Sequence, residues 1–177
     1  QGGLPQLKVG ATTTQAIIRV RAPGVLIANI GVNGAGATGG GISFDVSAGA
    51  YDSFGGSVED CHFKNCKGTT ATNAATGGAI NLNGAPWQMY FGYNRFYKCV
   101  GGIVVTSTSN DVPQDVTIEY NSFGGEAAST DVDIYGDFAV GLTIFGNRFE
   151  EKPALSSATT ARWIAITGSD GGIVAGN

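Results

Sequence analysis

The strongest constraint on the fold is a short segment that recurs along the chain: an apolar pair, then Asn, one further residue and Phe. Its clear copies end in Asn94-Arg95-Phe96, Asn121-Ser122-Phe123 and Asn147-Arg148-Phe149. Residues 173–177 begin a fourth copy, residues 56–63 are a degenerate copy with Cys61 in the Asn place, and residues 24–29 are an earlier one. The Asn-equivalent positions are then 29, 61, 94, 121, 147 and 177, at intervals of 32, 33, 27, 26 and 30 residues. Such a period is typical of a solenoid.

A second apolar segment alternates with the first. Its copies are residues 42–45, 80–83, 103–106, 132–135 and 164–167, and glycine runs precede three of them. Each copy alternates apolar with polar or small residues, which is the pattern of a strand with one buried face. No segment sustains the period of an amphipathic helix. Intervening segments such as 67–76 and 107–115 are rich in Thr, Asn, Ser, Asp and Gly, which is typical of loops.

Two short strands in about every 30 residues predict an all-β, single-stranded, right-handed parallel β-helix of about five to six coils. Stacking coils ~4.8 Å apart would bury the apolar faces and close the backbone hydrogen bonds together. The Asn residues would stack as a ladder at a bend, where Asn tolerates left-handed backbone. A β-sandwich is the alternative, but it does not explain why Asn-x-Phe recurs at coil spacing.

Two further columns follow from this stacking. Phe96, Phe123 and Phe149 should form an internal aromatic column. Cys66 and Cys99 each follow their Phe by three residues, so they should be neighbours at the mouth of a turn, because Glu126 and Lys152 take that place later.

Charge and cysteine content narrow the function. Ten Lys and Arg against fourteen Asp and Glu give a net charge of −4, so a nucleic-acid partner is not expected. No apolar run approaches the ~18 residues of a membrane span, and membrane insertion is not expected either. Three Cys, one His and no Cys-x-x-Cys do not assemble a zinc site, so the thiols are predicted to be small, half-buried groups of a protein made in a reducing compartment. We expect no cofactor and no metal.

With these features the sequence resembles the pectate-lyase-like right-handed β-helix superfamily, and within it the β-helices of bacteriophage tailspikes. Residues 22–30, 61–66, 78–82 and 94–99 carry the resemblance. Residues 17–177 would form the β-helix domain, which ends inside a coil, and residues 1–16 an N-terminal lead-in segment. The resemblance implies a homotrimer at the virion surface that contacts host cell-surface polysaccharide and other virion proteins, and several relatives cleave that polysaccharide.

The two best-defined enzyme branches of that superfamily are disfavoured. The Asn-Thr-Asp, Asp-Asp, His-Gly and Arg-Ile-Lys signatures of polygalacturonases do not occur. Arg19 and Arg21 do not form the Arg-x-Pro-x-x-Arg element of calcium pectate lyases. The likeness is therefore specific for architecture and weak for activity.

Candidate site residues come from the outward positions of the repeat. The column two residues before the Asn is expected to read Glu59, Gly92, Glu119, Phe145 and Gly176. Glu59 and Glu119 would be two rungs, about 9.6 Å, apart, with a shallow floor at Gly92 between them. Side chains leaning together would reach the ~6.5–9.5 Å separation of an inverting glycosidase pair. The alternative is two solvated acids on an ordinary outer sheet.

Aromatic side chains supply the predicted ligand contacts. Tyr90, Tyr93 and Tyr120 lie on or beside the same face, and Trp87 is a further candidate platform for a sugar. Asp111, Asp115, Asp131, Asp133 and Asp137 would form a row rather than a calcium cage. A catalytic triad through His62 is disfavoured, because no Gly-x-Ser-x-Gly elbow occurs. A Cys61–His62 pair is disfavoured as well, because sequence neighbours in a strand point to opposite faces.

The sequence thus favours a tailspike-like or tail-fibre-like virion protein that displays a surface for binding polysaccharide. The alternative is a polysaccharide depolymerase, a hydrolase or lyase, that acts on host capsule or O-antigen through Glu59 and Glu119. A shaft with no ligand is a third possibility.

Overall fold

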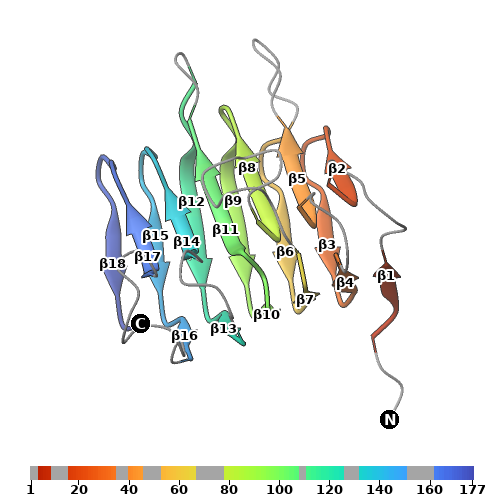
Figure 1. Cartoon of the computed structure of the whole chain (residues 1–177). Coiled ribbons are helices and arrows are strands. Elements are labelled where there is room, and N and C mark those ends of the chain that lie inside the picture. Colours follow the sequence, from red (N-terminus) through yellow and green to blue (C-terminus); the bar gives the residue numbers. More distant parts are fainter. Residues whose placement is uncertain are drawn as a thin grey trace.

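The computed structural model describes residues 4–8, 16–34, 40–45, 53–66, 78–107, 111–125, 132–150 and 162–177. These residues form strands and no helix. Three parallel sheets, which we call A, B and C, each contain six strands, and the chain visits the sheets in the order A, B, C (Figure 1). The protein is therefore a parallel β-solenoid, as the repeat predicted.

Each sheet takes one strand from every turn. Sheet A contains β1 (Gln6–Lys8), β4 (Gly31–Asn33), β7 (His62–Lys64), β10 (Arg95–Tyr97), β13 (Ser122–Gly124) and β16 (Arg148–Phe149). Sheet B contains β2 (Ile18–Val20), β5 (Ile42–Asp45), β8 (Ile80–Asn83), β11 (Gly101–Thr106), β14 (Val132–Gly136) and β17 (Arg162–Ile166). Sheet C contains β3 (Leu26–Ala28), β6 (Ser57–Glu59), β9 (Trp87–Gly92), β12 (Gln114–Glu119), β15 (Thr143–Phe145) and β18 (Ile173–Ala175).

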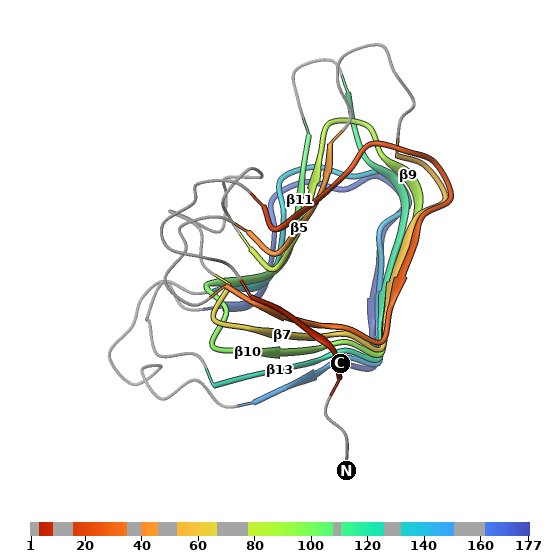
Figure 2. The same ribbon diagram turned by 90° about the vertical axis from the view of Figure 1, so that its right-hand side faces the viewer.

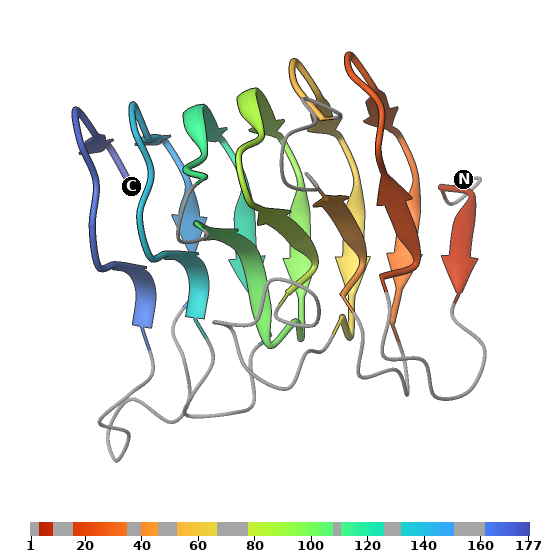
Figure 3. The ribbon, with the colours of Figure 1, turned by 90° about the horizontal axis from the view of Figure 1, so that it is seen from above.

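The three sheets enclose one apolar core. Viewed along the stack, the strands of each sheet lie over one another around a roughly triangular outline (Figure 2), and from above the turns follow one another in chain order (Figure 3). Inward side chains such as Phe44, Phe91, Ile103 and Ile118 are fully buried. In each six-stranded sheet, the two edge strands have only one neighbouring strand. Four turns are therefore flanked by a turn on both sides, whereas five to six coils were expected.

Like side chains pile into columns inside the solenoid, as predicted. The rings of Phe96 and Phe123 are parallel with centroids 4.7 Å apart, and Phe149 continues the stack at 5.1 Å. Phe63 joins the other end at 5.0 Å from Phe96. Close packing of these rings holds the strands of sheet A in register.

The Asn ladder is also present. Asn94, Asn121 and Asn147 are buried, and each Oδ1 accepts a hydrogen bond from the backbone N–H of the equivalent residue one turn earlier, at 3.0 Å. The Nδ2 of Asn121 donates to the Phe91 carbonyl at 3.0 Å. Asn177 continues the ladder below Asn147. The amides thus satisfy backbone groups that the bend takes out of the sheets.

Left-handed backbone turns each corner, but not at the Asn residues of the ladder. The residue before the ladder has positive φ in every turn: Asn29, Asp60, Tyr93, Tyr120, Gly146 and Gly176. The expectation that the ladder Asn itself adopts this conformation is wrong, because its side chain must point inward to reach the backbone of the preceding turn. A second column of left-handed residues lies near the start of the strands in sheet C and includes Gln88 in β9 and Asp115 in β12.

Several local alignments also differ from those expected. Each turn has three strands rather than two, because the Asn bend splits the repeat between sheets C and A. Ala28 pairs with Glu59, so Ile30 rather than Asn29 lies level with Cys61. In sheet B, Ile134 rather than Val132 lies beside Ile103, a shift of two residues that keeps the same side chains inward.

The cysteines lie deeper than predicted. Cys61, Cys66 and Cys99 are free thiols and all are buried, rather than half-buried or at a turn mouth. Cys66 and Cys99 are rung neighbours as expected, since the Val100 N–H donates to the Cys66 carbonyl. Glu126 and Lys152, on which the turn-mouth interpretation depended, lie outside the described residues. Within the predicted lead-in segment, Gln6–Lys8 forms β1 and pairs with β4.

Candidate functional site

The predicted carboxylate column lies on the outer face of sheet C. Glu59 pairs with Gly92, and Gly92 pairs with Glu119, so the two acids are two rungs apart on one column. Phe145 comes next, and Ala175 rather than Gly176 ends the column, since Ala175 is the residue two before Asn177 and Gly176 belongs to the corner. The alignment of Glu59 with Glu119 is therefore as expected.

The space between these acids is not a shallow floor. The Tyr90 ring lies over Gly92, so closely that a Cβ at Gly92 would stand 2.6 Å from Tyr90 Cζ. The Tyr90 hydroxyl donates a hydrogen bond of 2.8 Å to Glu119 Oε1. Desolvation, this hydrogen bond and the nearby charge of Glu119 raise the pKa of the Tyr90 phenol well above its usual value. A water or sugar between the carboxylates would first have to displace this ring.

Trp87 lies apart from that column. It begins β9, five residues before Gly92, and its ring packs at 5.5 Å against Phe54. At about 3.3 Å per residue along a strand, the Trp87 and Gly92 backbones are roughly 17 Å apart. A single bound sugar ring does not reach both.

Tyr93 and Tyr120 form an exposed pair at the corner between sheets C and A. Their rings are nearly parallel, with centroids 5.4 Å apart, and the side chains are 52% and 45% exposed. Tyr120 also leans over Gly146 in the following turn and meets the edge of the Phe145 ring. Both tyrosines have left-handed backbone, with φ of 58° and 52°. A bulky residue in that region is strained, whereas the next two turns use glycine there.

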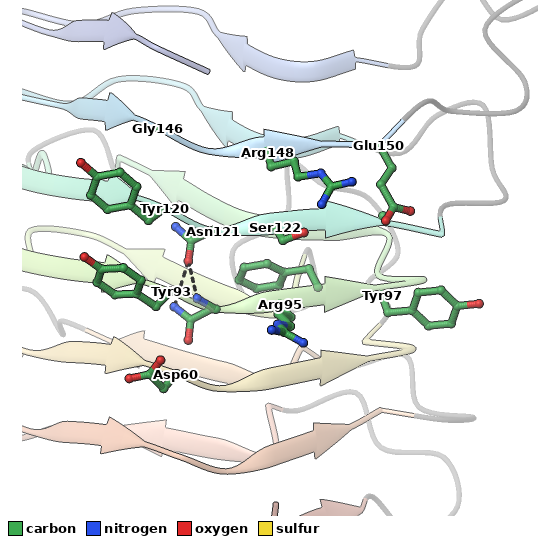
Figure 4. A pocket seen from close by; sticks show the side chains of 13 residues that line it. Asp60, Tyr93, Arg95, Tyr97, Tyr120, Asn121, Ser122, Gly146, Arg148 and Glu150 are labelled. Atoms are coloured by element: carbon green, nitrogen blue, oxygen red, sulfur yellow. Dashed lines mark hydrogen bonds between the residues drawn. The ribbon is translucent and has the colours of Figure 1, made fainter.

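These tyrosines form one side of a groove across the outer face of sheet A, with a volume of about 730 Å³. We call it the sheet A groove. Its principal lining side chains are Tyr93, Tyr120, Arg95, Ser122, Arg148 and Tyr97. Figure 4 shows Ser122 between Arg95 and Arg148 on successive strands, with the tyrosine pair at one end of those strands and Tyr97 at the other. The small side chain of Ser122 leaves the face recessed between Arg95 and Arg148, whereas the Glu150 carboxylate covers Gly124.

The groove contains only part of the predicted site. Tyr93 and Tyr120 line it, whereas Glu59, Glu119, Tyr90 and Trp87 do not. Arg95, Ser122 and Arg148 were missed by the sequence analysis. Their signal is the residue between Asn and Phe in each repeat, which must point outward because Asn and Phe both point inward.

The structure also locates the other residues considered for catalysis or metal binding. Cys61 is buried, and its neighbour His62 is exposed on the outer face of sheet A, so the two point apart as expected. Burial raises the pKa of the Cys61 and Cys99 thiols, which disfavours nucleophilic thiolates. Asp131 lies outside the described residues, and within them no three His, Cys, Asp or Glu side chains gather as a metal site. No helix in the described ranges has the length and apolar character needed to span a membrane.

Comparisons with protein-family models, with curated proteins and with solved structures found no match for this chain. The case for a function therefore depends on the geometry of these residues.

Proposed function

We propose that this protein is a tailspike-like or tail-fibre-like β-solenoid of a virion that binds host cell-surface polysaccharide in the sheet A groove. The parallel solenoid supports the resemblance to pectate-lyase-like β-helices, and stacked turns make a rigid surface for display. The resemblance also implies a homotrimer that has other virion proteins as partners. Sedimentation of the purified chain tests the trimer, because the measured mass should then be that of three 18.0 kDa chains.

The observation that carries the proposal is the strained tyrosine pair. Left-handed backbone costs a bulky residue roughly 1–2 kcal/mol, and glycine at the same corner avoids that cost. Tyr93 and Tyr120 nevertheless occupy it, about half exposed and stacked on one another. Strain of this kind is concentrated at functional sites. Two adjacent tyrosine rings offer the apolar faces and hydroxyls that sugar C–H groups and hydroxyls can contact.

Sheet C supports a depolymerase less well. Glu119 accepts the Tyr90 hydrogen bond, and the Tyr90 ring occupies the space over Gly92. An inverting glycosidase needs room for a water between its carboxylates.

A binding assay against immobilised bacterial capsular polysaccharides and O-antigens tests the proposal. We expect the unmodified chain to bind at least one polymer, and the double variant Tyr93→Asn/Tyr120→Asn to lose that binding. Asn is chosen because it tolerates left-handed backbone, as Asn29 and Asn65 do here. Phe138→Asn is the matched control, since Phe138 is an exposed aromatic that does not line the groove.

Equal binding by the double variant and the control would contradict the assignment of the groove. Failure to bind any polymer would contradict the proposed function. Release of new reducing ends or unsaturated sugars would instead favour the depolymerase, and loss of that release in Glu119→Gln would assign it to sheet C.

A further inference from the structure

Charge is divided between two faces of the solenoid. The strands of sheet A contain no Asp or Glu and carry Lys8, Lys64, Arg95 and Arg148. The strands of sheet C contain no Lys or Arg and carry Glu59, Asp115 and Glu119. A chain with a net charge of −4 therefore presents one cationic face, and that face holds the groove.

Two arginines dominate the middle of the groove. Arg95 and Arg148 each pair in register with Ser122, from opposite sides, so all three side chains leave the sheet in one column. Their Cα atoms are about 9.6 Å apart, or two rungs. Both arginine side chains are exposed, and neither guanidinium group has a hydrogen bond or ion pair with any residue that the structure describes. Their donors are free to bind a ligand.

The groove is also lined by two acids, neither of which forms an ion pair with Arg95 or Arg148. Asp60 lies at the corner beside Tyr93, one turn earlier, and the Glu150 carboxylate lies against Gly124 at the opposite end of the strands. Two further cations lie beside Tyr97 at the edge of the groove. The ammonium group of Lys64 is 5.8 Å from the centroid of the Tyr97 ring, and that of Lys98 is 5.4 Å from it. Four cations thus face two acids in and beside the groove.

We propose that the sheet A groove selects a polysaccharide that carries carboxylate groups, with Arg95 and Arg148 binding the carboxylates while Tyr93 and Tyr120 contact the sugar rings. This inference rests on the proposed function and names its ligand class. A guanidinium presents paired N–H donors that match the two oxygens of a carboxylate, and such charge-assisted bonds are stronger than neutral ones. Ser122 leaves room for a sugar to lie between them.

A polymer with sparse charge fits this groove better than a nucleic acid. Only two cations line the groove, and a nucleic acid carries a phosphate at every nucleotide. The tyrosine rings stack on each other at 5.4 Å, which leaves no space for a base to insert between them. The acidic strands of sheet C would also repel a long polyanion that wrapped around the solenoid.

The experiment measures affinity for carboxylate-bearing capsular polysaccharides, for the same polymers after reduction of their carboxyl groups to alcohols, and for neutral dextran and amylose. We expect a carboxylate-bearing polymer to bind and to lose at least about tenfold in affinity after carboxyl reduction. Arg95→Gln and Arg148→Gln should each cause a similar loss, with melting temperatures unchanged. Lys8→Gln, an exposed cation of sheet A outside the groove, is the matched control and should bind normally.

The possible outcomes separate the two proposals. Binding that needs Tyr93 and Tyr120 but is unaffected by carboxyl reduction and by both arginine variants overturns the carboxylate assignment and leaves the polysaccharide function standing. Tighter binding of single-stranded oligo(dT) than of every polysaccharide overturns the ligand class. Failure of the unmodified chain to bind any polymer overturns both proposals. Intermediate affinity in Arg95→Lys would support paired donors over charge alone.

Discussion

Asn121 connects three successive turns through one buried amide. Its Oδ1 accepts from the Asn94 N–H and Nδ2, and its Nδ2 donates to the Phe91 carbonyl and to Asn147 Oδ1. Removing the amide leaves buried hydrogen-bond donors and a buried acceptor without a partner, in a place that no water reaches. Asn121→Ala should therefore lower the free energy of unfolding by about 2–4 kcal/mol, measured by urea denaturation.

The control for Asn121 is Gln114→Ala, which removes an exposed amide from β12. That change should fall within about ±0.5 kcal/mol, as for most surface positions. Similar small losses at both residues would mean that the ladder contributes little to stability.

Tyr120 combines a favourable ring stack with unfavourable backbone. Tyr120→Ala removes the ring but keeps the strain, since Ala also disfavours a φ of 52°. Tyr120→Gly removes both. We therefore expect the Gly variant to be more stable than the Ala variant by about 1 kcal/mol in thermal or urea unfolding. A more stable Ala variant would show that the corner is not strained, and the functional argument from strain would then fail.

The sequence predicts the ladder better than the corner beside it. Asn recurs at 94, 121, 147 and 177 because its amide satisfies the same backbone groups in each turn. The strained position has Asp60, Tyr93, Tyr120 and Gly146, which belong to three different residue types. The backbone geometry of the stack sets that position, so the sequence alone does not reveal which residue takes the left-handed conformation.

Strands β9 and β12 are joined by a side-chain contact as well as by their backbone pairing. The Tyr90 hydroxyl on β9 donates to Glu119 on β12, and the pKa of Tyr90 is raised above its usual value near 10. Above pH 10 the unfolded chain releases this proton while the folded protein holds it, so folding stability falls as pH rises through this window.

Tyr90→Phe removes that proton, so its stability should fall less steeply than that of the unmodified protein above pH 10. Urea denaturation at pH 7, 10 and 11 measures the difference between the two proteins, in which the other tyrosines and thiols cancel. Between pH 7 and pH 10 the difference should stay nearly constant. Parallel loss in both proteins above pH 10 would contradict the raised pKa.

Strand length decides which elements the sequence predicts. The six-residue strands β9, β11 and β12 contain enough positions to show their apolar pattern, and they were predicted. In sheet A, β7 and β10 have three residues each and one inward Phe, so no alternation is visible. The sequence pattern therefore joins them to the preceding segment as one strand, and it does not separate out the face that bears Arg95 and Arg148.

The division of charge belongs to the whole molecule, because it depends on which strands share a face. Lys64 and Arg95 are one turn apart along the chain, and Arg95 and Arg148 are two turns apart, so composition reports only the net charge of −4. Stacking places them on sheet A and places Glu59 and Glu119 on sheet C. Local potentials therefore have opposite signs on two faces, and a charged surface can bind the face that complements it.

Ion exchange tests this arrangement without any knowledge of the natural ligand. At pH 7 and low salt, a protein of net charge −4 with evenly mixed charge should pass through a cation exchanger, whereas this chain should be retained through sheet A. Salt near 0.15 M shortens the screening length to ≈ 8 Å and should elute it. Arg95→Gln should elute earlier, while Arg19→Gln, which removes one cation from sheet B instead, should shift elution less. Equal shifts in both would mean that retention follows total charge, and the cationic face would then have no separate effect.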